Sequence, residues 1–128
     1  MSAEITLNHT IIPSLDNVEA AKFYANIFGF DFIKEWGHFA VVKASSTLTL
    51  DFVTSEEKIS SHHYAFKVNE QQFDEIFERI KSINLAYGSG PDTQDDGEIN
   101  HLHGGRGVYF KDPSGHVLEM ITTDYVLD

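Results

Sequence analysis

The sequence predicts an α+β fold built from two tandem βαβββ modules. Two observations predict it: the order strand, helix and three strands occurs twice, and the same capping signal precedes each helix. The join is expected near residues 54–61, with one module over about residues 1–57 and the other over about 58–128. Because 128 residues suit one domain with a real core, we expect a single domain over residues 1–128. Its two modules would form one curved mixed sheet with a concave site.

The first module opens with a predicted strand over residues 5–12, which Pro13 is expected to end. Asp16 and Glu19 have the spacing of a helical capping box, and Gly29 suits the position just after a helix. Between these signals, apolar residues recur at the helical period: Ala20, Phe23, Tyr24, Ile27 and Phe28. Three β-type runs follow, over residues 30–36, 39–44 and 47–53.

The second module repeats this order. A strand is predicted over residues 62–68, and Asn69 and Gln72 repeat the capping-box spacing. The helical stripe consists of Phe73, Ile76, Phe77 and Ile80. Further strands are predicted over residues 85–87, 107–111 and 117–122, and Asp112-Pro113-Ser114-Gly115 forms a strong turn signal between the last two.

Charge and composition exclude several classes of partner. The net charge of −11 argues against nucleic acid and against anionic membrane surfaces, because both attract positive proteins. The chain has no cysteine, so a cysteine-based zinc site and a thiol nucleophile are excluded. Neither a signal peptide nor a membrane-spanning run is visible, and we expect a cytoplasmic protein with a small-molecule substrate.

Each half of the repeat carries a histidine in its first strand and an acid in its last strand. These residues are His9 and Asp51 in the first half, and His63 and Glu119 in the second. An acid in an apolar strand is costly unless it is paired or bound to a cation. Two imidazoles and one carboxylate suit Fe(II), Mn(II), Ni(II) or Zn(II). The structural alternative stays open here, because strand histidines and strand acids often have no ligand role.

Side-chain alternation supports a ligand role for His63. In the strand over residues 62–68, Tyr64, Phe66 and Val68 share one face, which we expect to pack on the helix. His63 and Ala65 share the other face, which would line the cavity.

Residues 99–107 form a glycine-rich segment with two histidines and one arginine. We expect a loop over the cavity in which His101 or Arg106 contacts the substrate, and Arg106 would hold an anionic oxygen. A flexible surface loop is the alternative. His38 and His116 lie at predicted turns, and the sequence alone assigns them no role.

Several stretches together resemble the vicinal oxygen chelate superfamily, which includes glyoxalases, bleomycin-resistance proteins and extradiol dioxygenases. The stretches are Leu7-Asn8-His9-Thr10, Phe28-Gly29-Phe30, His63 to Val68, and Val108 to Glu119, which contains the most specific string, Asp112-Pro113-Ser114-Gly115-His116. The resemblance implies two βαβββ modules, a homodimer, and a divalent metal chelated by two substrate oxygens. It also places His9, His63 and Glu119 at metal-ligand positions. Asp51 matches a fourth ligand position, where glyoxalase I has Glu, which puts glyoxalase I activity in doubt.

The resemblance implies a metal-dependent enzyme of glyoxalase or dioxygenase type. It would act on a small oxygen-chelating substrate through an enolate-like or oxyanion intermediate. Glu119 or Asp51 would serve as the base, and His101, Arg106 and Tyr109 would contact the substrate. The alternative is a metal-independent protein that sequesters a small molecule, of the bleomycin-resistance type. The presence of the ligand residues argues against this alternative.

Overall fold

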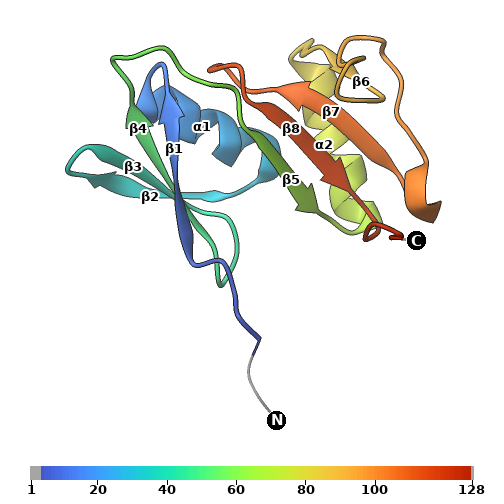
Figure 1. Ribbon diagram of the computed structural model, residues 1–128, viewed down its shortest axis with the longest axis horizontal. Coiled ribbons are helices and arrows are strands. Elements are labelled where there is room, and N and C mark those ends of the chain that lie inside the picture. The colour runs from blue at the N-terminus through green and yellow to red at the C-terminus, as the bar shows by residue number, and fades with distance from the viewer. Residues whose placement is uncertain (1–3, 128) are drawn as a thin grey trace. The chain divides into compact units, whose positions relative to one another are not determined.

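Residues 4–127 are described by a computed structural model (Figure 1), in which the chain divides into two compact units between Ile59 and Ser60. Each unit contains one long helix and one four-stranded mixed sheet, in the order βαβββ. The predicted α+β class and the duplicated order of elements are therefore confirmed. The expectation of a single domain over residues 1–128 stays a prediction. No helix within residues 4–127 is both long and apolar enough to cross a membrane.

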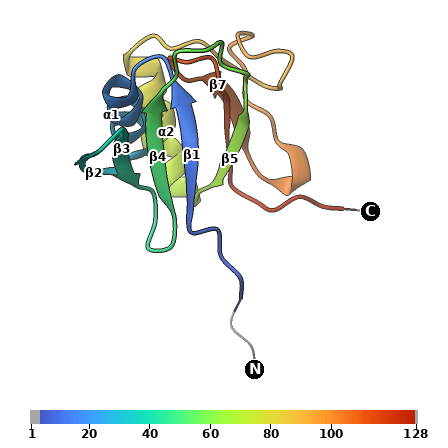
Figure 2. The ribbon, with the colours of Figure 1, turned by 60° about the vertical axis from the view of Figure 1, so that its left-hand side comes forward.

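The first unit places its first and last strands side by side (Figure 2). Its elements are β1 (His9–Ser14), α1 (Asn17–Phe28), β2 (Asp31–Trp36), β3 (Phe39–Lys43) and β4 (Thr49–Thr54). The strand order is β1-β4-β3-β2, in which β1 runs parallel to β4 and the other pairs are antiparallel. The α1 residue Tyr24 packs on Phe52 of β4, with 4.7 Å between the ring centroids. This contact lies in the core between helix and sheet.

The predicted bounds of the first strand were wrong. The strand begins at His9 rather than Ile5, and it continues through Pro13 to Ser14. Pro13 pairs with Val53, although proline cannot donate a ladder hydrogen bond. Because β1 is at the edge of its sheet, a missing N–H group is tolerated there. The helix signals were read correctly: Asp16 caps α1, and Gly29 adopts φ 79° after it.

The second unit repeats the architecture with a shorter second strand. Its elements are β5 (His63–Lys67), α2 (Glu70–Ser82), β6 (Tyr87–Gly88), the short 3₁₀ turn η1 (Leu102–Gly104), β7 (Gly107–Lys111) and β8 (Val117–Ile121). The strand order is β5-β8-β7-β6, with β5 parallel to β8. Phe73, Ile76 and Ile80 of α2 are buried, as are Phe110 and Leu118 of the sheet. The predicted apolar stripe is therefore the core face of α2.

The parallel strand pairs have the same register in both units. In the first unit His9 lies opposite Thr49, and Asp51 follows two residues along β4. In the second unit His63 lies opposite Val117, and Glu119 follows two residues along β8. Because side chains two residues apart in a strand share a face, each histidine shares a sheet face with the acid of its own unit.

Helix α2 begins with a complete capping box, and this makes the first prediction. The Asn69 side chain accepts from the Gln72 N–H at 2.8 Å, and the Gln72 side chain accepts from the Asn69 N–H at 2.9 Å. Asn69→Ala should lower the free energy of unfolding by about 1 kcal/mol, because one helix N–H loses its partner. Chemical denaturation measures this change. Gln71→Ala is the control, and it should cost no more than about 0.5 kcal/mol. Equal effects of the two variants would contradict the role of the cap.

Candidate metal and substrate site

Strands β5 and β8 bring two of the predicted ligands together. His63 Nε2 lies 3.1 Å from Glu119 Oε1. The Glu119 side chain is only 4% exposed, whereas the His63 side chain is 46% exposed. The pair therefore combines a buried carboxylate with an imidazole that solvent can reach.

The hydrogen bonds of His63 fix which ring nitrogen faces Glu119. His63 Nδ1 lies 3.0 Å from the carbonyl oxygen of Val117. Because a carbonyl oxygen can only accept, Nδ1 must carry the proton in this bond. Neutral His63 therefore directs the lone pair of Nε2 toward a carboxylate oxygen. Two lone-pair donors that converge in this way fit a divalent transition metal, while a protonated His63 would form an ion pair with Glu119 instead.

Tyr109 on β7 completes this side of the site. It lies opposite Glu119 in the β7–β8 ladder, and its ring stacks on His63 with 5.9 Å between the centroids. Burial, and then the charge and hydrogen bond of Glu119, raise the pKa of Tyr109 to about 12. The hydroxyl therefore stays protonated at neutral pH and donates to Glu119. From the sequence, Tyr109 was expected only to contact the substrate, and that role stays a prediction.

His9 and Asp51 belong to the first unit. His9 is exposed, and its Nδ1 lies 2.7 Å from the amide oxygen of Asn8. Since that oxygen can only accept, His9 also carries its proton on Nδ1 and presents the lone pair of Nε2. Asp51 is half-buried in β4, opposite Val41 of β3. Over residues 4–127, no group of three or more His, Asp or Glu side chains is gathered around one metal position. The ligand role of His9 and the ligand or base role of Asp51 stay predictions.

Arg106 is held by α2. Its Nε donates to Glu70 at 2.8 Å, its Nη1 lies 2.9 Å from Asp74, and its guanidinium lies 4.2 Å from the centre of the Phe73 ring. From the sequence, the positive charge of Arg106 was expected to hold a substrate oxygen. In the structure, two carboxylates and an aromatic ring already compensate that charge. The contacts give Arg106 a structural task, because they attach the loop before β7 to α2. His101 is exposed in that loop. The substrate-contact roles of both residues stay predictions.

The same loop is tied to the residues that follow β8, a contact that the sequence did not predict. His103 Nδ1 accepts from the N–H of Val126 at 3.0 Å, and its ring packs edge-on against Tyr125. Lys67 forms an ion pair with Asp124 at 3.0 Å. Lys67 lies four residues after His63 and therefore on the same face of β5. Residues 122–126, here called the C-terminal segment, thus reach the sheet face that carries His63 and Glu119. The only sequence signal was Gly104-Gly105, since paired glycines permit close approach of two backbones.

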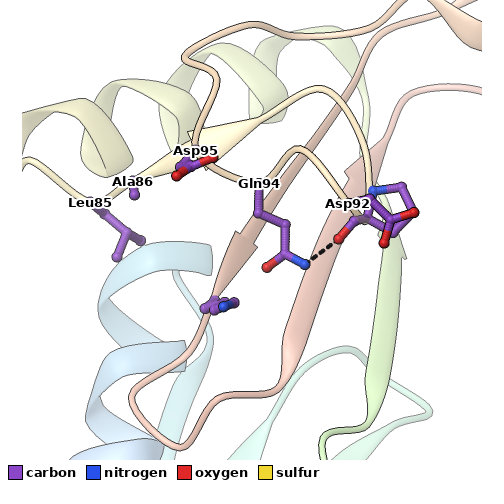
Figure 3. A pocket seen from close by; sticks show the side chains of 7 residues that line it. Leu85, Ala86, Asp92, Gln94 and Asp95 are labelled. Carbon is purple, nitrogen blue, oxygen red and sulfur yellow. Dashed lines mark hydrogen bonds between the residues drawn. The ribbon is translucent and has the colours of Figure 1, made fainter.

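A separate hollow of about 400 Å³ lies in the second unit (Figure 3). It is lined by Leu85, Ala86, Pro91, Asp92, Gln94, Asp95 and Lys111. The Gln94 amide nitrogen donates to the carbonyl of Pro91, while its Oε1 is buried without a hydrogen-bond partner. None of the predicted site residues lines this hollow, whereas His63 and Glu119 lie together on β5 and β8.

Comparison with known proteins places the chain in a family. Residues 6–120 match the model of the Glyoxalase/Bleomycin resistance protein/Dioxygenase superfamily, and the chain belongs to that superfamily. Among solved structures, it is similar to "Oxidase ChaP-H2", at 42% identity and a TM-score of 0.91, over 96% of this chain and 97% of that one. It is also similar to "Oxidase ChaP-H1", at 41% identity and a TM-score of 0.89, over 94% and 98% of the two chains. A Metallothiol transferase FosB from Lysinibacillus sphaericus is 21% identical over 122 residues, which are 91% of this chain and 82% of that protein.

The contact between loop and C-terminal segment makes the second prediction. A Cβ atom on Gly105 would lie 2.6 Å from the hydroxyl oxygens of Thr122 and Thr123. Gly105→Ala should therefore push the C-terminal segment away and cost about 1–3 kcal/mol of stability. It should also accelerate hydrogen exchange at the Val126 N–H, which bonds to His103.

Gly104→Ala is the matched control. A Cβ there meets nothing within 4 Å, but φ is +78°, so alanine is strained without touching the C-terminal segment. Mass spectrometry or NMR should detect faster exchange at Val126 only in the Gly105 variant. Equal exchange rates in both variants would show that Gly105 does not hold the segment in place.

Proposed function

We propose that this protein is a metal-dependent enzyme that binds one divalent transition metal through His9, His63 and Glu119. The observation that carries the proposal is the geometry of the second unit. Hydrogen bonding to Val117 leaves Nε2 of His63 as a lone-pair donor 3.1 Å from a buried carboxylate. Fe, Mn, Ni and Zn all accept a set of two imidazoles and one carboxylate. The homodimer expected from the superfamily belongs to the same proposal.

The residues around the pair have separable tasks. A divalent metal held there would supply a Lewis acid that stabilises negative charge on an oxygen of a small oxygen-chelating substrate. Tyr109 donates to Glu119 and so holds the carboxylate in one orientation. Val117 does the same for the His63 ring. Asp51 is a candidate base or a further ligand. Its side chain is one methylene shorter than that of Glu, and whether its carboxylate reaches the metal decides between these roles.

We propose that the reaction is an oxidation. The two relatives named as oxidases are 42% and 41% identical to this chain over nearly its whole length. The two relatives named as metallothiol transferases are 21% and 26% identical. Dioxygenase-like chemistry is therefore better supported than the lyase or isomerase chemistry of a glyoxalase type, or than the thiol transfer named for the more distant relatives. A small substrate with two neighbouring oxygens, such as a catechol, is the first probe.

The third prediction concerns metal content. Untagged protein should contain about one transition metal ion per chain, and chelation should lower its melting temperature, because a ligand bound only to the folded state stabilises it. His63→Ala and Glu119→Gln should each reduce metal content while the circular dichroism spectrum stays folded. His38→Ala is the control, since His38 lies at the exposed turn between β2 and β3. It should bind metal like the parent protein.

The outcomes separate the candidate functions. A parent protein without metal, and without a thermal response to added Fe, Mn, Ni or Zn, would leave His63 and Glu119 as an ion pair and favour metal-independent sequestration of a small molecule. If metal binds, oxygen uptake with iron and a catechol supports an oxidation. Turnover of a hemithioacetal with nickel, without oxygen uptake, would instead assign glyoxalase chemistry.

A further inference from the structure

We propose that His116 is a positioning residue for His63. Its buried imidazole accepts a backbone hydrogen bond at the start of β5, and this bond fixes the direction in which the His63 ring faces. The proposal extends the proposed function, because it explains how one metal ligand is aimed. Its main measurement uses metal-free protein and therefore does not depend on the metal.

His116 is fully buried, at 0% exposure. Its Nδ1 lies 2.9 Å from the backbone nitrogen of His62. Because a backbone N–H can only donate, Nδ1 of His116 must be the acceptor and carries no proton in this bond. The sequence placed His116 at a turn without a role, yet the structure gives its side chain a polar contact 54 residues away in the chain.

This bond belongs to a group of three that fastens the start of β5 to the start of β8. Val117 N–H donates to the His62 carbonyl at 2.9 Å, and His63 Nδ1–H donates to the Val117 carbonyl at 3.0 Å. The parallel ladder itself begins only at His63 and Val117. The N–H of His62 therefore lies just before the ladder, and the His116 side chain supplies an acceptor where no strand residue does.

The turn before β8 holds the backbone of His116 in place independently of its ring. Asp112 Oδ1 accepts from the N–H groups of Ser114 and His116, both at 2.9 Å. A change confined to the His116 side chain should leave these two bonds intact. It should remove the bond that reaches His62, so substitution tests the role of the ring.

A packing role is the competing explanation. The His116 ring lies 5.0 Å from the His62 ring and 5.7 Å from the Tyr64 ring, so an apolar residue of similar size would also fill the space. Leucine fills this space without an acceptor. Asparagine is smaller, but its Oδ1 can occupy the position of Nδ1. If the acceptor matters, His116→Asn should preserve the orientation of His63, and His116→Leu should not.

The test is NMR of metal-free, ¹⁵N-labelled protein at neutral pH. In the parent protein, a coupling across the hydrogen bond should join the His62 backbone nitrogen to His116 Nδ1. The Nδ1–H of His63 should give a slowly exchanging signal. His116→Asn should keep the His63 signal, and His116→Leu should lose it or show fast exchange. Val108→Ala is the control for core damage, because Val108 is fully buried in β7 of the same sheet.

A second readout is the affinity for Co²⁺, measured by calorimetry. The Leu variant should bind roughly 10–100-fold more weakly, as is usual when the partner that orients a metal ligand is lost. The Asn variant should stay within a few fold of the parent. An unchanged His63 signal in the Leu variant, or equal losses in the Asn and Leu variants, would overturn the proposal.

The parent protein keeps the proposal testable if the Leu variant does not fold, because absence of the His62–His116 coupling there would refute it. A parent protein that shows the coupling and the His63 signal but binds no metal would refute the proposed function alone.

Discussion

The parallel pairing of β5 with β8 is the interaction on which the candidate site depends. It sets His63 opposite Val117 and thereby brings Glu119 within 3.1 Å of the imidazole. The register is fixed on the opposite face of β8, where Leu118 and Met120 are fully buried. A slip of one residue would turn Glu119 toward the core and expose these apolar side chains. The hydrophobic core therefore decides where the polar pair lies.

The buried carboxylate imposes a second constraint. An isolated charge at the position of Glu119 would be expensive, since burial removes its hydration. Tyr109 supplies a compensating hydrogen bond, and burial, followed by the charge and hydrogen bond of Glu119, raises the pKa of Tyr109 to about 12. The net charge of the chain is −11, and Glu119 is one of its buried acids. A buried carboxylate in a negatively charged protein is the environment expected where a cation binds.

The features that depend on neighbouring residues, such as helix caps and strand alternation, were predictable from the sequence. Asp16 and Asn69 mark the helix starts, and the alternation in β5 separates His63 from Tyr64 correctly. Prediction from the sequence failed where distant segments decide. Pro13 lies inside a strand because β1 turned out to be an edge strand. The contacts that Arg106 and His116 make were not foreseen, because their partners lie 36 and 54 residues away in the chain, beyond the reach of any periodicity.

The two units also differ in a way that favours three ligands over four. Asp51 has the register of Glu119, yet the residue opposite it is Val41, where the second unit has Tyr109. Valine has no hydroxyl to hold a carboxylate, and Asp reaches one methylene less far than Glu. His9, in contrast, shares with His63 a proton on Nδ1 that is donated to an oxygen, which leaves the lone pair on Nε2. The duplication has thus preserved the imidazole in both halves, while only the second half retains the surroundings that orient an acid.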